Sequence, residues 1–379
     1  LNYKKFRSKI LITSTQNPYN GGGATNAYKL ISYLRTLGYQ CCGIFFSNNY
    51  RDKIDPDNIG GVCQIGLTPD FQLKKTVLHS LNARKFVLDY FKSYPDLILG
   101  LNYGAPILSR FIFPNIKIIY LVVGSPVLTL GTDSFIHKNI SFQRALLDKN
   151  NFQENEDEQK CIRISDCVCP NNQNLYELLK LLYDTNKLTK PKDYAKNILE
   201  RTDNMDINYE KEYDLIAIAS NWKRKVKNFE MIYEIYEKLP NLKKIIVGYE
   251  QNLDLVNTDV YPRIPYDKLQ KLLSKTKIAI STSFFESGPN IVLEAFNNNC
   301  NFIGSKNIGY KNLLVDYQLV DDVYDSNQYI KKIAYILNNN PKIQSVNYEA
   351  DKINFIKFIN KFVSFKKLKI LFVSCDIPY

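Results

Sequence analysis

The amino-acid sequence predicts an α/β protein of two domains, each with strands and helices alternating around a parallel sheet. The chain has 379 residues, which exceeds the size at which a single hydrophobic core stops growing. Short apolar runs alternate with amphipathic stretches along both halves, a pattern typical of βαβ units. Between about residues 184 and 213 this pattern gives way to a Lys-, Asn- and Asp-rich stretch that contains Pro191. We therefore expect the two domains to be joined there.

The apolar runs mark the expected strands, because strands covered on both faces are short and almost continuously hydrophobic. In the N-terminal half they cover residues 10–12, 43–46, 97–99, 118–123 and 167–169. In the C-terminal half they cover residues 215–219, 244–247, 278–280 and 301–303. The expected helices cover residues 24–37, 229–239, 266–273 and 290–296. The interpretation places the N-terminal domain at residues 1–190, the linker at 191–212 and the C-terminal domain at 213–343.

The last residues of the chain repeat its beginning. Residues 369–371 have the Lys-Ile-Leu sequence of residues 9–11, and Pro378-Tyr379 repeats Pro18-Tyr19 at the same separation. We expect residues 367–379 to be the first strand of a second tandem copy of the fold. The chain would then be a fragment of a longer protein, which agrees with Leu1 in place of an initiator Met.

Charge and composition narrow the classes of partner. The net charge of +12 favours anionic partners such as a nucleotide diphosphate or an acidic membrane surface, although a diffusely basic solvated surface is the simpler interpretation. No basic run is interleaved with aromatic residues, so nucleic acid is not an expected partner. The acidic cluster at residues 154–158 is expected to be a solvated helix face without a functional role.

Cysteine and histidine usage argues against a disulfide framework and a histidine-based site. The eight cysteines contain no CxxC pair, which suits reduced thiols in a cytoplasmic protein. His79 and His137 are the only histidines, too few for a histidine-rich metal site or a histidine-centred triad. No apolar run reaches the 18 or so residues that span a bilayer. We expect a soluble protein, with at most peripheral contact with a membrane.

A glycine loop after the first expected strand is a candidate anion site. Gly22 and Gly23 lie in the run from Asn17 to Asn26, which leads directly into a helix. Glycines let the backbone approach a ligand, and helix N-terminal amides favour negative charge. The loop is neither GxGxxG nor a P-loop. A flexible strand-to-helix turn remains the alternative.

Two glutamates flank a second loop of this kind. Glu286 follows the strand at residues 278–280, and Glu294 lies more than a turn into the next helix. Pro289 suits the first helical turn, because its missing N–H costs nothing there. A diphosphate could rest on the amides at this turn, with Glu286 facing a sugar and Glu294 a ribose. The spacing of the two glutamates alone is weak evidence for a binding site. The strand before them and the helix that starts at Pro289 make it informative.

The stretch from residue 281 to 304 resembles the retaining glycosyltransferases of family 4, which have the GT-B fold. The family pattern is a strand, an aromatic residue, a Glu, a Gly-containing loop, an aliphatic run, a second Glu with Ala, and a strand ending in Gly. Here the pattern runs from Phe285-Glu286 to Gly304. The resemblance is strong over about residues 244–304, looser over 10–38 and faint between 50 and 165.

The resemblance implies two Rossmann-like domains that face each other across a cleft. It also implies a C-terminal helix, at residues 344–366, that crosses back to the N-terminal domain. A lysine and an arginine neutralise the donor diphosphate in this family, and Lys227 matches the lysine. Strict spacing would place the arginine at Asn221, so the nearest arginine, Arg224, takes this role here.

Further site residues follow from the resemblance. The catalytic candidates are Glu286, Lys227 and Arg224. The residues expected to bind the donor are Gly22, Gly23, Ile264, Ser287, Gly288, Pro289, Asn290 and Glu294. The family often has a histidine near the reacting centre, within the segment that here reads 122–126 and lacks one. Candidates for the acceptor side are Tyr103, Ser125 and His137.

The activity implied is transfer of a hexosyl or N-acetylhexosaminyl group, with retention, from a UDP- or GDP-sugar to a hydroxyl. The acceptor would be a glycan, a lipid-linked molecule or a protein, and neither a metal nor another cofactor is expected. The main alternative is an inactive nucleotide-binding scaffold within a larger glycosyltransferase. A nucleotide-sugar epimerase and an NAD-dependent dehydrogenase are further alternatives. The strand at residues 43–46 ends in Ser-Asn-Asn rather than the acidic residue of a dehydrogenase, and no histidine-rich cluster suggests an epimerase.

Overall fold

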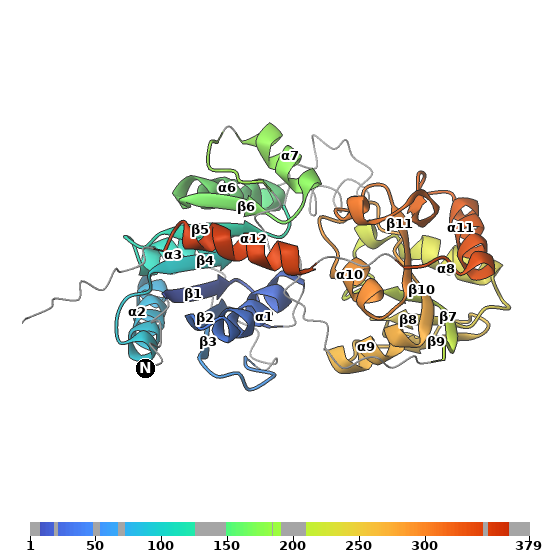
Figure 1. The fold of residues 1–379 in the computed structure, drawn as a ribbon, viewed down its shortest axis with the longest axis horizontal. Coiled ribbons are helices and arrows are strands. Elements are labelled where there is room, and N and C mark those ends of the chain that lie inside the picture. Colours follow the sequence, from blue (N-terminus) through green and yellow to red (C-terminus); the bar gives the residue numbers. More distant parts are fainter. Residues whose placement is uncertain are drawn as a thin grey trace, which may run out of the picture.

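Each half of the chain contains one six-stranded sheet in which every strand pair is parallel. The computed structural model describes residues 8–18, 22–47, 54–66, 73–125, 149–183, 185–190, 210–343 and 348–363. Figure 1 shows the two sheets side by side, each covered by helices. The prediction of an α/β protein with two Rossmann-like domains is therefore confirmed.

The N-terminal sheet has the strand order β3-β2-β1-β4-β5-β6. Its strands are β1 (Lys9–Ser14), β2 (Gln40–Phe46), β3 (Val62–Ile65), β4 (Leu97–Leu101), β5 (Ile118–Val122) and β6 (Cys167–Pro170). The helices described in this half are α1 (Gly22–Thr36), α2 (Leu73–Phe91), α3 (Ala105–Ile112), α6 (Lys149–Ile164) and α7 (Gln173–Leu182).

The C-terminal sheet has the order β12-β11-β10-β7-β8-β9. Its strands are β7 (Tyr213–Ile218), β8 (Lys244–Val247), β9 (Thr258–Tyr261), β10 (Thr276–Ile280), β11 (Asn301–Ser305) and β12 (Leu319–Val320). The α-helices are α8 (Phe229–Lys238), α9 (Tyr266–Ser274), α10 (Asn290–Asn297) and α11 (Ser326–Asn339). Three short 3₁₀ helices are η2 (Lys225–Lys227), η3 (Lys311–Leu313) and η4 (Asp316–Gln318).

Both sheets have the same topology, and it determines where a ligand can bind. The chain enters each sheet at an inner strand, moves outward to one edge, and returns to pair on the other side of that inner strand. Strand order therefore reverses between β1 and β4, and again between β7 and β10. Ligands of open α/β sheets bind outside the carboxyl ends of the strands at such a point. Burial on both faces explains why β4 and β5 are apolar at nearly every position.

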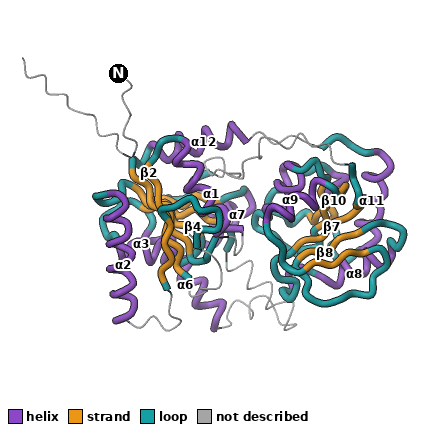
Figure 2. The backbone as a smooth tube through the Cα atoms, turned by 90° about the horizontal axis from the view of Figure 1, so that it is seen from below, coloured by secondary structure: helices purple, strands orange, loops and turns teal. Residues whose placement is uncertain are grey.

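The last described helix, α12 (Tyr348–Asn360), returns to the N-terminal domain, as expected for residues 344–366. Phe355, Phe358 and Ile359 are buried in the same cluster as Ile10 of β1. The Tyr39 hydroxyl lies 2.6 Å from the Asn360 side-chain oxygen, to which it donates a hydrogen bond. Figures 1 and 2 both show α12 against this half of the molecule. Two buried phenylalanines contribute roughly 3–6 kcal/mol of hydrophobic free energy to this attachment.

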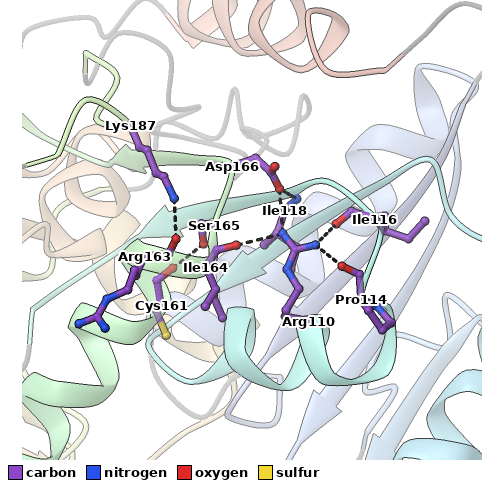
Figure 3. Close-up of polar contacts among 10 residues, drawn as sticks. All are labelled: Arg110, Pro114, Ile116, Ile118, Cys161, Arg163, Ile164, Ser165, Asp166 and Lys187. Atoms are coloured by element: carbon purple, nitrogen blue, oxygen red, sulfur yellow. Dashed lines mark hydrogen bonds and ion pairs between the residues drawn. The ribbon is translucent and has the colours of Figure 1, made fainter.

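Arg110 ties together the amino ends of β5 and β6, at the edge opposite the expected ligand (Figure 3). Its guanidinium donates to the carbonyl oxygens of Ile116, at 2.8 Å, and Ile164, at 2.9 Å. It also forms an ion pair with the Asp166 carboxylate at 3.0 Å. The same carboxylate accepts a hydrogen bond from the Ile118 backbone N–H at 2.8 Å. These contacts satisfy backbone groups where the strands begin, so we assign this cluster a structural role.

The expected strands and helices are all present, with bounds that shift by a few residues. Helix α1 begins at Gly22 rather than at residue 24. Most of the linker, residues 191–209, and the whole of residues 367–379 lie outside the described residues. The domain boundaries therefore stay predictions. No helix in the described part of the chain is long and apolar enough to cross a membrane.

Candidate functional site

A cavity of about 1110 Å³ lies between the two domains. From the N-terminal domain it is lined by the start of α1, the residues after β2 and β5, and Asn171 after β6. From the C-terminal domain it is lined by residues that follow β7, β8 and β10. The cavity thus lies at the carboxyl ends of both sheets, where the topology predicts a ligand.

Lys227 and Glu286 form an ion pair at the wall of this cavity. Their side chains are only 18% and 19% exposed, so water screens the pair less than it would at the surface. The Ser283 hydroxyl donates to the Glu286 carboxylate at 2.9 Å, and the Thr282 hydroxyl donates to the Lys227 carbonyl at 3.1 Å. Ser283 and Lys227 therefore orient the Glu286 carboxylate, and Thr282 fixes the Lys227 backbone.

The loop from Glu286 to Pro289 leads into α10, and its residues line the same cavity. Pro289 is the N-cap, so the helix starts at Asn290, one residue later than expected for a proline in the first turn. The Ser287 side chain is buried, and its hydroxyl has no hydrogen-bond partner in the described part of the chain. Backbone amides at this helix start and a free hydroxyl can both bind an anionic ligand.

Glu294 lies in the second turn of α10, 8% exposed, with its carboxyl facing Lys29 of the N-terminal domain. Burial raises the pKa of Glu294 to about 7, against a smaller lowering by Lys29. Burial lowers the pKa of Lys29 to about 8, and Glu294 and Asp57 oppose that effect. The Lys29 ammonium lies 3.9 Å from the centroid of the Tyr266 ring. This part of the cavity can switch its charge near neutral pH.

Gly23 of the glycine loop and Ile264, which was expected to bind the donor, also line the cavity. Gly23 has no room for a side chain, because a Cβ atom would lie 2.7 Å from the Val123 side chain. Gly22 starts α1. Ile264 lines the wall with its neighbours, residues 263–267.

Arg224 lines the cavity, whereas Asn221 does not. The Asn221 side-chain oxygen instead accepts the Lys223 backbone N–H at 2.9 Å and stabilises the turn before η2. The structure therefore brings together Arg224, Lys227 and Glu286, the three catalytic candidates.

Two of the three acceptor-side candidates, Tyr103 and Ser125, do not line the cavity. Tyr103 packs beside the buried cluster of β5, α6 and α7. Ser125 is buried and donates to the Glu158 carboxylate at 2.8 Å. His137 lies outside the described residues. The wall formed by Val123 and Gly124 is the part of this segment that reaches the cavity.

The interpretation of residues 154–158 as a solvated helix face is wrong for Glu158. This residue is on α6 but is fully buried, and it accepts hydrogen bonds from Ser125 and, at 2.9 Å, from the Tyr183 hydroxyl. Burial raises its pKa to about 7. Its partners are distant in sequence, so the local pattern of charges could not reveal the burial.

The residues that the sequence analysis missed include three that line the cavity, Asn26, Lys29 and Asn171, and their neighbour Asn172, because their role depends on contacts between domains. Asn26 and Lys29 lie one helical turn apart on α1, whose other face is apolar and buried. The local sequence offered one sign of this role, two polar residues spaced one turn apart on the same side of the helix. Asn171 lines the cavity, and Asn172 beside it contacts the Ser287 carbonyl of the other domain.

Residues 55–57 form an Asp-x-Asp triplet, which bears on the metal-free prediction. The Asp55 carboxylate accepts the Tyr28 hydroxyl at 2.5 Å and the backbone N–H groups of Ile59 and Gly60. Asp57 lines the cavity. The described residues contain no group of three or more His, Cys, Asp or Glu side chains that could hold a metal ion. Metal independence remains a prediction to be tested.

Comparisons with known proteins agree with this geometry. The sequence of residues 200–353 matches the family model described as Glycosyl transferases group 1, whereas no curated protein matches the chain. Sucrose-phosphate synthase from Thermosynechococcus elongatus has a similar structure, with a TM-score of 0.61 and 13% identity over 94% of this chain and 95% of that one.

Two further solved structures are similar at the same identity. HepE from Anabaena, in complex with UDP and glucose, has a TM-score of 0.61 and 13% identity over 94% of this chain and 98% of its own. The lipopolysaccharide outer core galactosyltransferase WaaB has a TM-score of 0.60 and 13% identity, with coverage of 94% and 99%. At such identities the likeness shows the fold. Residues 200–353 of this chain are therefore a glycosyl transferases group 1 domain, the C-terminal half of a GT-B fold.

Proposed function

We propose that this chain transfers a sugar from a nucleotide diphosphate sugar to a hydroxyl group, with retention at the anomeric carbon and without a metal ion. The observation that carries the proposal is the Lys227–Glu286 pair, which shares one cavity between two Rossmann-like domains with Glu294. The pair and the second carboxylate belong to the domain that matches the glycosyl transferases group 1 model.

The proposed chemistry separates a charged leaving group from the sugar. The bond from the anomeric carbon to the diphosphate oxygen breaks, and the acceptor oxygen bonds to that carbon on the same face. The acceptor hydroxyl gives its proton to the departing diphosphate. Lys227, Arg224 and the amides at the start of α10 stabilise the negative charge that develops on the diphosphate, because they are fixed before the reaction.

The two glutamates have separate roles in this scheme. Glu286 accepts hydrogen bonds from sugar hydroxyls. Its ion pair with Lys227 sets the orientation of its carboxylate. Glu294 accepts hydrogen bonds from the ribose hydroxyls, deeper in the cavity wall. Ile264 and Tyr266 line the part of the cavity left for the base. Because both domains contribute to the walls, closure of the domains would exclude water and favour transfer over hydrolysis.

UDP-glucose is the first donor to test, because HepE was solved with UDP and glucose. Proton NMR would follow the sugar of UDP-, GDP- and ADP-glucose, with and without EDTA, since slow hydrolysis needs no known acceptor. We expect cleavage of one nucleotide sugar that EDTA does not reduce. With a simple alcohol added as acceptor we expect an α-glycoside, whose configuration is stable, whereas free glucose would mutarotate. Loss of activity with EDTA would reject the metal-free mechanism, and a β product would reject retention.

The same experiment decides between the alternatives. A scaffold would bind a nucleotide, seen as a rise in melting temperature, and would leave every donor intact. An epimerase would change the configuration of a ring carbon other than the anomeric one. The fold alone does not separate these functions. Comparison of UDP-glucose with UDP-N-acetylglucosamine would decide between hexosyl and N-acetylhexosaminyl transfer.

A further inference from the structure

Two neighbouring asparagines of the N-terminal domain contact the donor loop of the C-terminal domain. Asn171 and Asn172 lie between β6 and α7, and each is only 2% exposed. The Asn172 side-chain amide donates a hydrogen bond to the carbonyl oxygen of Ser287. Its side-chain oxygen accepts the Leu175 backbone N–H at 3.0 Å and so caps α7. One side chain thus connects a helix of one domain to a loop of the other.

Asn171 completes this connection. Its side-chain oxygen lies 2.5 Å from the Asn172 amide nitrogen, from which it accepts a hydrogen bond, and its own amide donates to the Val123 carbonyl at 3.3 Å. The loop approaches so closely that a Cβ atom on Gly288 would lie 2.6 Å from the Asn171 amide nitrogen. The contact therefore requires a glycine at that position.

The same loop is held from its other side by its own domain. The Gly309 backbone N–H donates to the Glu286 carbonyl at 2.8 Å. A Cβ atom on Gly309 would collide with the Ser287 carbonyl oxygen, the acceptor that Asn172 uses. The peptide from Glu286 to Gly288 is thus held between two domains. If the domains moved apart, Glu286 would keep its contacts with Gly309, Ser283 and Lys227, whereas the Ser287 carbonyl would lose Asn172.

We propose that Asn171 and Asn172 are positioning residues that fix the Glu286–Gly288 loop when the domains close. This asparagine pair links domain closure to the placement of the Glu286 carboxylate and of the Ser287 hydroxyl. The inference rests on the proposed function, because Glu286 matters only if it acts on a donor sugar. The pair itself touches the loop backbone rather than the reacting atoms.

The substitution Asn172→Asp separates this role from helix capping. Aspartate keeps an oxygen for the Leu175 amide and is a good N-cap, but it cannot donate to the Ser287 carbonyl and places a negative charge beside it. Gln173→Glu is the matched control, because this exposed neighbour makes the same amide-to-carboxylate change and its side chain hydrogen-bonds to Glu177 of its own helix. Asn172→Ser is a second variant that keeps a capping oxygen without the added charge.

Three measurements test the inference on the whole chain. The rate constant kcat for UDP-glucose cleavage should fall about tenfold to a hundredfold in Asn172→Asp and Asn172→Ser, with an unchanged melting temperature. UDP affinity should change by less than about threefold, since Lys227 and Glu294 remain. Small-angle X-ray scattering with UDP should give a larger radius of gyration for both variants than for the wild type and Gln173→Glu.

The outcomes distinguish this inference from the proposed function. An inactive wild type would reject the proposed function, and scattering would still decide whether the asparagines hold the domains closed. Wild-type kcat and wild-type scattering in both Asn172 variants would overturn the inference. A fall in melting temperature and UDP affinity equal to the fall in kcat would also overturn it, because a structural role alone would explain the losses.

Discussion

Lys29 and Glu294 come from different domains, and each shifts the pKa of the other across the cleft. Burial raises the pKa of the Glu294 carboxyl to about 7, and the Lys29 ammonium opposes that rise. Lys29 itself is held between this carboxyl, Asp57 and the Tyr266 ring. The proposed ribose site therefore contains a carboxyl that changes its charge near neutral pH.

UDP affinity should increase as the pH rises through about 7. An ionised Glu294 accepts two hydrogen bonds from ribose hydroxyls, whereas the protonated group uses one oxygen as a donor. Calorimetric titration of UDP between pH 6 and 8 should show this increase in the wild type. In Glu294→Gln the affinity should be weaker by about tenfold, the loss of one hydrogen bond to a charged group. It should also vary less with pH than in the wild type, because only Lys29 and the terminal phosphate of UDP still titrate. A variant that binds UDP as the wild type does would remove Glu294 from the site.

Removing Lys29 should move this pH dependence upward. In Lys29→Met the carboxyl of Glu294 loses the cation that favours its ionised form, so the pH midpoint of UDP affinity should rise above about 7. Lys352→Met is the control, because Lys352 also lies over a tyrosine ring, 5.4 Å from the Tyr33 centroid, but away from the cavity. Titration of both variants with UDP measures the two midpoints. An unchanged midpoint in Lys29→Met would show that the two charges do not interact in solution.

Glu294 and Glu158 should make the folded state less stable as the pH rises. Each has an ordinary pKa of 4.5, and in the folded chain each is raised to about 7. A raised pKa means that the contribution to stability is fully present below about 4.5 and is lost as the pH rises through about 7. Each group should lower the free energy of unfolding by about 3 kcal/mol over this window.

Glutamine substitutions measure these two effects separately. Urea unfolding at pH 5 and pH 8 should show a smaller difference in stability for Glu294→Gln and for Glu158→Gln than for the wild type. Only the first variant should weaken UDP binding, because Glu158 does not line the cavity. The same pH difference in all three proteins would mean that neither carboxyl is protonated in the folded state at pH 5.

Gly309 should not tolerate a side chain. In Gly309→Ala the new Cβ atom would collide with the Ser287 carbonyl, so the Glu286–Gly288 loop must move. A displacement of this size at a reacting centre costs about a hundredfold in rate. We expect kcat for donor cleavage to fall by that amount in a variant that circular dichroism shows to be folded. Full activity of Gly309→Ala would show that the loop position is not critical.

The sequence predicts the inner strands of both sheets better than the strands at the edges. The inner strands β1, β4, β7 and β10 are buried on both faces, and an apolar run is enough to find them. The strands that were missed, β3, β9 and β12, all lie at sheet edges. Solvent on one side allows polar residues there, as in β9, so no apolar run marks these strands.

Residues of the site could be predicted where a local sequence pattern marks them, and not where their role depends on a contact with the other domain. Glu286, Glu294 and Lys227 could be found because short segments after strand ends contain them with a recognisable pattern. Lys29, Asn171 and Asn172 acquire their roles only when the second domain lies opposite, and no spacing within the sequence records that contact. Tyr103 and Ser125, two candidates for the acceptor side, do not line the cavity, because position after a strand end does not fix which way a side chain turns.

The ion pair of Lys227 and Glu286 is central to the account, and cleavage of UDP-glucose by single-site variants tests it most directly. Glu286→Gln and Lys227→Ala should each lower kcat by about two decades or more, the loss of one fixed charge at the reacting centre. Lys225→Ala should retain wild-type turnover, because Lys225 forms an exposed pair with Glu230 outside the cavity lining. Near-native turnover in Glu286→Gln and Lys227→Ala, in protein that melts at the wild-type temperature, would contradict the account.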